Sequence, residues 1–267
     1  MVFSTRPVCA AGTDIPFAYR GGMIWVKVTV NGQPRPLDFI LDSGASESVL
    51  DLQAAHRLGL RAGACESVQG VAGRCCGFRV DGLAAKLSDI PMPRAVLALD
   101  LAPVSQGCGR HIDGLIGADF FHGRIVQIDF ATKEVRLFTR QEFSAEGAQP
   151  IPLATYNHVL CVRVGVNGDA PRWMRLDTGC SSALEWVASS SAARKYPRAS
   201  IATATGSRRI IDTGVTLGSE HFSAVKTGLH DDPIFAGEAG LLGTGLLSHF
   251  CLTVDTAKSQ IFLRRID

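Results

Sequence analysis

Two stretches of the sequence decide the fold. Residues 37–44 read LDFILDSG and residues 173–179 read WMRLDTG, so in each an apolar run ends in an aspartate, a hydroxyl residue and a glycine. A single triplet of this kind is most often an ordinary turn, because Asp and Gly favour turns. Each of these two stretches carries the triplet directly behind an apolar strand, and this repetition points to chemistry at Asp42 and Asp177.

The sequence around the two triplets is repeated as well. Before each lies an alternating apolar run that ends in Asn-Gly, VKVTVNG at 26–32 and VRVGVNG at 162–168. The alternation is typical of a strand, and Asn-Gly of a tight hairpin turn. After each triplet come a Gly-apolar-apolar-Gly motif and two more strands, at 114–117, 125–130 and 135–138 and again at 240–243, 251–254 and 260–263. One structural unit therefore occurs twice, over residues 22–138 and 158–263.

This repeat predicts a mostly β chain of two homologous lobes with few short helices. We expect the boundary in the segment 141–152, which contains Gly, Ala and two prolines, and therefore an N-terminal lobe of residues 1–145 and a C-terminal lobe of residues 146–267. Residues 51–58 form the best candidate helix, ended by Gly59. A short helical turn is also expected after each Gly-apolar-apolar-Gly motif.

Two related lobes packed face to face would bring the triplet loops together on a pseudo-twofold axis. The carboxylates of Asp42 and Asp177 would then share one proton, because adjacent like charges do not both ionise cheaply. One carboxylate would activate a water, and the other, protonated, would polarise a substrate carbonyl and later protonate the leaving amine. Small or hydroxyl side chains are expected to support the loops by leaving room or by bonding across to the opposite loop: Ser43, Gly44, Thr178 and Gly179.

The paired motifs resemble those of the retropepsin-like and pepsin-like aspartic peptidases. Each triplet is followed some seventy residues later by apolar-apolar-Gly, which in that family supports the catalytic loop. The resemblance implies two retropepsin-like β-barrel lobes, as in bacterial-type single-chain, two-lobed aspartyl proteases. It also implies an aspartic endopeptidase that cleaves peptides or unfolded proteins and works as a monomer, a pseudo-dimer of its own halves. The alternative is a non-catalytic, peptide-binding module on the same fold.

The resemblance also implies a flap between each triplet and its supporting motif. The glycine-rich run at 69–74 supplies the candidate residues of the first flap: Gly70, Val71, Ala72 and Gly73. Residues 203–207 are a weaker counterpart, and neither run contains a tyrosine. Ala45 and Cys180 stand where pepsins usually carry Ser or Thr, able to hydrogen-bond the outer carboxylate oxygen. Without that hydroxyl we expect a mildly acidic pH optimum.

Composition excludes several other classes of function. The net charge of +2 gives no indication of a nucleic-acid partner, and no apolar run approaches the roughly 20 residues that span a bilayer. No cofactor or metal is expected, because the sequence lacks a phosphate-binding loop, a Cys-x-x-Cys pair and His-x-x-x-His spacing. A cysteine nucleophile at Cys180 is disfavoured because no histidine is singled out as its base.

The eight cysteines leave the compartment open. Cys161 and Cys251 lie in apolar runs and are expected to be buried, while Cys65 has two alternative disulfide partners, Cys75 and Cys76, in an oxidising environment. The N-terminus has no apolar signal core. The chain would be periplasmic or secreted if a signal peptide had been removed, and otherwise cytoplasmic.

The sequence contains a third triplet, Asp212-Thr213-Gly214. It lies only 28 residues before Gly240, too few for a flap and its return strands, and the first lobe has no triplet at the equivalent place. We therefore interpret Asp212 as a strand-edge or turn residue, with Gly214 permitting a bend.

Overall fold

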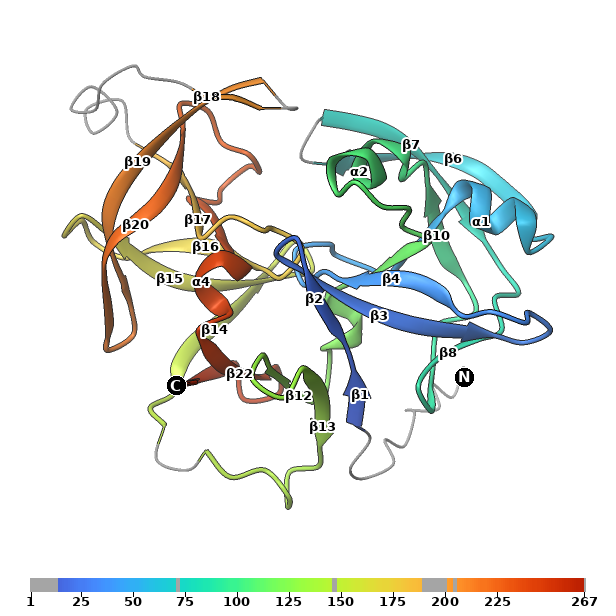
Figure 1. Cartoon of the computed structure of the whole chain (residues 1–267), viewed down its shortest axis with the longest axis horizontal. Helices are drawn as coiled ribbons and strands as arrows, with labels where there is room; N and C mark the ends of the chain where they lie inside the picture. Colours follow the sequence, from blue (N-terminus) through green and yellow to red (C-terminus); the bar gives the residue numbers. More distant parts are fainter. Residues whose placement is uncertain (1–13, 71–72, 146–147, 189–200, 204–205, 267) are drawn as a thin grey trace.

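The computed structural model describes residues 14–70, 73–145, 148–188, 201–203 and 206–266. Strands dominate these residues and the helices are short (Figure 1). Strands β1 (Asp14–Pro16) and β2 (Ala18–Arg20) precede the first copy of the repeat, which forms β3 (Met23–Val30), β4 (Leu37–Leu41), β5 (Val49–Asp51), α1 (Leu52–Arg57), β6 (Ala62–Gly70), β7 (Gly73–Val80), β8 (Ala85–Leu87), β9 (Ile90–Pro91), β10 (Val96–Leu99), α2 (Ala102–Gly107), β11 (Gly114–Ile116), the 3-10 helix η1 (Ala118–Phe120), β12 (Ile125–Asp129) and β13 (Glu134–Phe138). The second copy forms β14 (Ile151–Tyr156), β15 (Val159–Val166), β16 (Arg172–Asp177), β17 (Leu184–Val187), β18 (Ile201–Thr203), β19 (Gly206–Leu217), β20 (Glu220–His230), β21 (Gly240–Gly243), α4 (Thr244–Leu247), β22 (Phe250–Asp255) and β23 (Gln260–Arg265).

The two lobes share one strand order. In the second lobe the strands run β15-β16-β21-β17-β20-β19, and the sheet closes on itself because β19 also pairs with β15. In the first lobe the order is β3-β4-β11-β5-β10-β7, and β8 returns to pair with β3. The single long strand β19 thus takes the place of β7 and β8 together. This equivalence confirms the prediction of two homologous, mostly β lobes.

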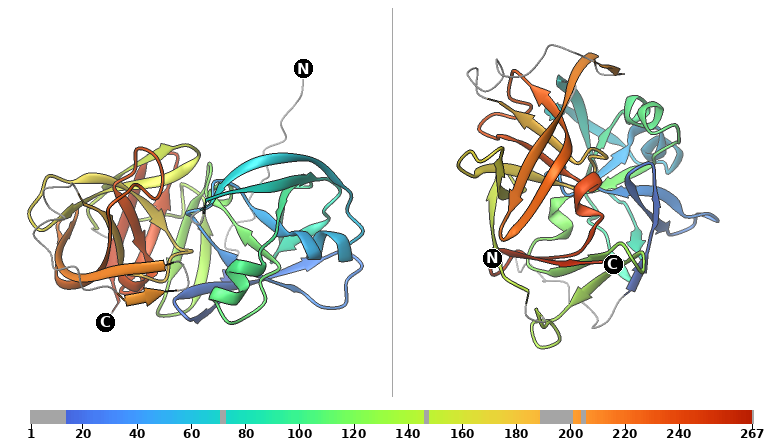
Figure 2. Two further views of the ribbon diagram at one scale, coloured as in Figure 1. Left: turned by 90° about the horizontal axis from the view of Figure 1, so that it is seen from above. Right: turned by 60° about the vertical axis from the view of Figure 1, so that its left-hand side comes forward.

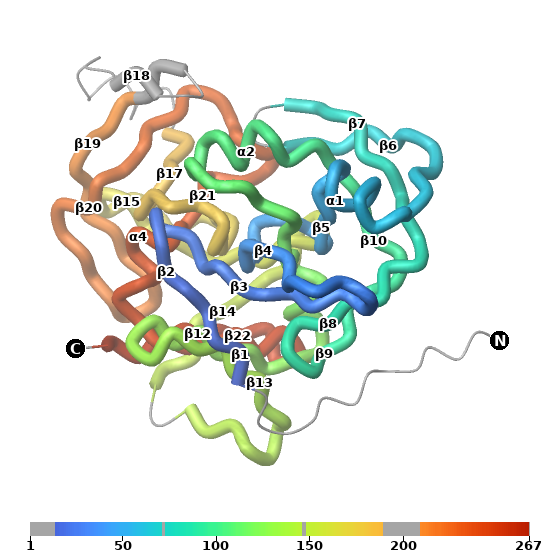
Figure 3. The backbone as a smooth tube through the Cα atoms, turned by 45° about the vertical axis from the view of Figure 1, so that its right-hand side comes forward, coloured from blue at the N-terminus to red at the C-terminus, as the bar shows by residue number. Residues whose placement is uncertain are grey.

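Strands from both ends of the repeat join the lobes. Their order is β1-β13-β12-β22-β23-β14, and the central pair, β12 with β22, brings one strand of each copy together. Figure 2 shows the lobes side by side, and Figure 3 shows β1, β12, β13 and β22 gathered along one side of the molecule. The joining sheet therefore holds the two halves in a fixed relation.

The hydrophobic core follows the alternation of the strands. Its main cluster runs through both lobes and includes fully buried residues such as Phe39, Phe121 and Phe250. A smaller cluster packs on the other face of the first-lobe sheet and contains Trp25, Ile40, Val49, Leu97, Leu101 and Ile112. Cys161 and Cys251 are buried, as predicted.

The expected helices are present. Asp51 caps α1 by accepting a hydrogen bond from the amide of Ala54, and Ala54 and Ala55 bury the inner face of the helix. Gly59, with a φ of +71°, takes the chain away from its end. The short helices η1 and α4 follow the two Gly-apolar-apolar-Gly motifs, also as predicted.

A short segment separates each Asn-Gly turn from the returning strand. A turn does form, since the amide of Gln33 bonds to the carbonyl of Val30 at 3.0 Å and that of Asp169 to Val166 at 3.0 Å. The returning strands nevertheless begin only at Leu37 and Arg172. Prolines lie in both intervening segments, at 34, 36 and 171. Because proline donates no backbone hydrogen bond, ladder pairing resumes only beyond them.

Candidate active site

Each triplet loop emerges from a strand that is clamped by its Gly-apolar-apolar-Gly motif. Strand β4 pairs in parallel with β11, and the amide of Asp42 bonds to the carbonyl of Ile116 at 2.8 Å. Strand β16 pairs in parallel with β21, where Asp177 lies opposite Gly243. A Cβ added at Gly117 would lie 2.3 Å from the carbonyl carbon of Glu47, so the last glycine of the motif permits the close approach.

The hydroxyls of Ser43 and Thr178 link the two loops reciprocally. The Ser43 hydroxyl donates to the carbonyl of Leu176 at 2.6 Å and accepts from the amide of Thr178 at 3.1 Å. The Thr178 hydroxyl donates to the carbonyl of Leu41 at 2.8 Å and accepts from the amide of Ser43 at 2.9 Å. Both side chains are fully buried. Each loop is thereby held by the other lobe.

The two aspartates meet across the lobe boundary. A Cβ added at Gly44 would lie 2.4 Å from Cγ of Asp177, and one added at Gly179 would lie 2.4 Å from Cγ of Asp42. Each glycine therefore makes room for the carboxylate of the opposite loop. The amides of Gly44 and Ala45 donate to Oδ1 of Asp42 at 3.0 and 3.2 Å, and the amide of Gly179 donates to Oδ1 of Asp177 at 2.9 Å.

Comparison with protein families finds a match for the first lobe. Residues 26–120, which contain the first triplet loop and its supporting motif, match a family model described as aspartyl protease. This part of the chain is similar to aspartyl proteases. Comparison with curated proteins finds no match.

Burial and mutual repulsion set the protonation of the carboxylate pair. Asp42 is half-buried and Asp177 buried. Burial raises the pKa of Asp42, opposed by the amides of Gly44 and Ala45. Burial, and then the charge of Asp42, raise the pKa of Asp177 well above its ordinary value. The arrangement favours one proton held between two carboxylates.

The residues expected to form the flap lie at the end of a long hairpin. Strands β6 and β7 are antiparallel, with Gln69 opposite Arg74 and Gly70 opposite Gly73. Val71 and Ala72, the predicted tip, lie outside the residues that the structure describes. In the second lobe β18 and β19 form a shorter hairpin in which Thr203 lies opposite Gly206, and Figure 1 places both hairpins along the same edge of the molecule.

A disulfide joins the strands of the β6–β7 hairpin. It links Cys65 to Cys76, and Cys75 is exposed and free. Cys65 lies opposite Phe78 in the ladder, and Cys76 is two residues from Phe78, on the same face. Cys75 points to the other face, because successive side chains alternate across a strand. The register therefore resolves the alternative that the spacing left open.

Asp212 and Cys180 could be mistaken for catalytic residues, but their surroundings differ from those of Asp42 and Asp177. Asp212 is exposed on β19 and forms an ion pair with Lys226 at 2.8 Å. The ladder register shifts between Thr213 and Val215, so Gly214 lies at the irregularity, as expected. Burial, and then the charge of Asp177, raise the pKa of Cys180 to about 12, which keeps the thiol protonated and disfavours a cysteine nucleophile.

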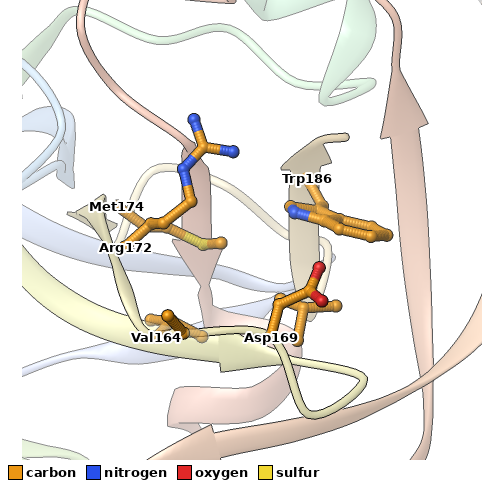
Figure 4. Close-up of a pocket in the computed structure, with 7 residues that line it drawn as sticks. Val164, Asp169, Arg172, Met174 and Trp186 are labelled. Carbon is orange, nitrogen blue, oxygen red and sulfur yellow. The ribbon is translucent and has the colours of Figure 1, made fainter. Parts of the chain in front are cut away.

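The second lobe also contains a cavity that neither Asp42 nor Asp177 lines. A cavity of about 290 Å³ in the second lobe is lined by Val164, Val166, Asp169, Ala170, Arg172, Met174 and Trp186 (Figure 4). Among the described residues, no group of three or more His, Cys, Asp or Glu side chains is placed to hold a metal ion. In the same part of the chain, no helix is long and apolar enough to cross a membrane.

The sequence interpretation missed a buried ion pair beside the site. Arg175 lies two residues before Asp177, and its guanidinium forms a two-pronged hydrogen-bonded pair with Glu238 at 2.8 and 2.5 Å. Its signal was present in the repeat. Arg175 and Glu238 stand where the first copy has Ile40 and Ile112, so a position-by-position comparison of the two copies would have exposed the substitution.

Proposed function

We propose that the chain is a single-chain aspartic endopeptidase, of the bacterial two-lobed type, in which Asp42 and Asp177 form one catalytic unit. The observation that carries the proposal is the reciprocal approach of the two triplet loops. Each loop places its glycine against the carboxylate of the other loop, and the crossed Ser43 and Thr178 hydroxyls hold both in register. An ordinary pair of Asp-containing turns would not require this complementarity.

The chemistry follows from a carboxylate pair that carries one proton. The ionised member takes a proton from a water positioned between the two groups, and that water attacks the peptide carbonyl. The protonated member donates a hydrogen bond to the carbonyl oxygen and stabilises the charge that develops there. Proton transfer to the nitrogen then releases the amine. The two amides on Oδ1 of Asp42 favour its ionised form.

The proposed substrate is an extended peptide or an unfolded protein that binds between the lobes under the β6–β7 hairpin. The proposed domains are residues 1–145 and 146–267, each supplying one aspartate. One chain thus contains both halves of the site, and the active species is a monomer. Sedimentation across a dilution series tests this point, and an obligate dimer whose activity falls on dilution would contradict it.

Three single variants and one double variant test the assignment of the aspartates. Asp42→Asn and Asp177→Asn should each abolish cleavage of an unfolded protein or a peptide library, and the double variant should lose little more, because the pair acts as a unit. Asp212→Asn is the control, since it alters an exposed Asp-Thr-Gly aspartate and should keep near-normal turnover. A statine-type transition-state mimic should inhibit the parent chain.

The same assay separates the peptidase from a binding module. Substantial residual turnover in Asp42→Asn would refute the catalytic pair, and loss of activity in Asp212→Asn alone would mean that the wrong loops have been paired. A parent chain that binds unfolded protein from about pH 3 to about pH 8 and cleaves none of it would favour the non-catalytic alternative.

A further inference from the structure

Arg175 is a buried charge that reaches from one lobe into the catalytic loop of the other. Only 7% of its surface is exposed. Its Nη1 donates to the carbonyl of Gly44 at 2.7 Å, while Nε and Nη2 donate to the two carboxylate oxygens of Glu238. Its guanidinium also lies over the ring of Phe235, 3.4 Å from the centroid. The side chain therefore has a fixed position beside the two triplets.

The equivalent positions of the first lobe hold an uncharged pair of residues. Ile40 stands two residues before Asp42, as Arg175 stands two before Asp177, and Ile112 stands two before Gly114, as Glu238 stands two before Gly240. Ile40 and Ile112 are both buried in the smaller hydrophobic cluster. Because an apolar pair suffices in the first lobe, stability alone does not account for an ion pair in the second.

The placement of Arg175 gives its charge an effect on the site. Its electrostatic attraction lowers the pKa of both Asp42 and Asp177, against the larger opposing effect of burial. A charge in a poorly solvated position is weakly screened, so its influence reaches both carboxylates.

Other titratable groups pack around Arg175 and must be considered with it. Glu238 partly neutralises it, and Cys161 lies opposite it on β15. Burial raises the pKa of Cys161 to about 12, so its thiol is uncharged. On β17 and β20, Glu185 and His230 form a separate pair at 2.6 Å. Cys180, next to the Asp177 loop, also keeps its proton. Among the described residues of this cluster, Arg175 is therefore the cation that contacts a triplet loop directly.

We propose that Arg175, held by Glu238, is a positioning residue for the catalytic pair. It fixes the Gly44 carbonyl of the opposite loop and supplies a fixed positive charge that favours the singly ionised pair. This inference rests on the proposed function, since it concerns how that site is held and charged. It makes the site electrostatically unequal although the two loops are related by the repeat.

The repeat itself provides the test variant. Arg175→Ile combined with Glu238→Ile gives the second lobe the isoleucine pair found in the first lobe. It removes the ion pair without leaving a lone buried charge. Loss of the nearby positive charge should raise the pKa of the carboxylate pair, so the acidic limb of the pH–turnover profile should move to higher pH. At a pH on that limb, turnover relative to the plateau should fall about tenfold. Arg175→Lys keeps the charge, so the limb should stay in place while the plateau falls.

Glu238→Gln should shift the acidic limb in the opposite direction. It keeps the shape of the side chain but leaves the charge of Arg175 less neutralised, so the acidic limb should move to lower pH. Urea unfolding confirms that each variant is folded, and if the double isoleucine variant does not fold, the sign of the Glu238→Gln shift decides. A limb that stays in place in the folded double variant, or that moves upward in Glu238→Gln, would overturn the inference while leaving the peptidase assignment intact. A parent chain without turnover would overturn both.

Discussion

The crossed hydroxyls of Ser43 and Thr178 make a quantitative prediction about stability. Ser43→Ala removes the hydrogen bond to the carbonyl of Leu176 and the acceptor of the Thr178 amide, at 2.6 and 3.1 Å. Both groups are buried, and a broken buried hydrogen bond costs about 1–2 kcal/mol. The free energy of unfolding should therefore fall by about 2–4 kcal/mol.

Two further variants separate the hydroxyl from the rest of the side chain. Thr178→Ser keeps both hydrogen bonds and loses one buried methyl group, which should cost about 1 kcal/mol. Ser46→Ala is the matched control, because Ser46 is an exposed serine in the same loop and its loss should change stability by less than about 0.5 kcal/mol. If the hydroxyl network matters, the three variants must rank in this order.

The assay is urea unfolding monitored by tryptophan fluorescence, and turnover is measured separately on the folded protein. Because the bonds cross between lobes, Ser43→Ala should also lower turnover while Ser46→Ala leaves it unchanged. If the unfolding free energy of Ser43→Ala lies within about 0.5 kcal/mol of the parent chain's, the two buried hydrogen bonds do not hold the loops.

The remaining predictions concern charge and the flap. Asp177→Asn should stabilise the protein near neutral pH: the folded-state pKa of Asp177 is raised, so ionisation penalises the folded state as pH rises. This gain should shrink in urea unfolding below about pH 4, where the carboxyl is protonated in both states. Ala45→Ser adds a hydroxyl beside Asp42 and should move the pH optimum of turnover downward, whereas a parent optimum near about pH 2 would contradict the expected mildly acidic one. Peptide mapping of the oxidised protein should find Cys65 linked to Cys76 and Cys75 open to alkylation; a Cys65–Cys75 link would show that the hairpin register is wrong.

Local repetition explains why so much of the fold could be predicted. Strand alternation, the triplets and the Gly-apolar-apolar-Gly motifs each carry a short-range signal, and each occurs twice in the same order. The joining sheet was harder to foresee. Its central pairing of β12 with β22 links residues more than a hundred positions apart, and nothing within either strand specifies the partner. The same limit applied to Cys65, whose partner depends on the register of β6 against β7 and not on spacing.

The site shows where a repeat misleads as well as where it helps. Equivalence of the two copies predicts a symmetric pair of loops, and the crossed hydroxyls follow that symmetry closely. Two related carboxylates must nevertheless do different work, since one gains a proton while the other loses it. A symmetric scaffold provides no reason for either to be the base. Among the described residues, the departures from symmetry lie at this point: two amides donate to Asp42 and one to Asp177, and a buried arginine stands where the other copy has Ile40. A residue that breaks an internal repeat beside a shared site thus indicates a role in addition to packing, because packing alone would have allowed the symmetric choice.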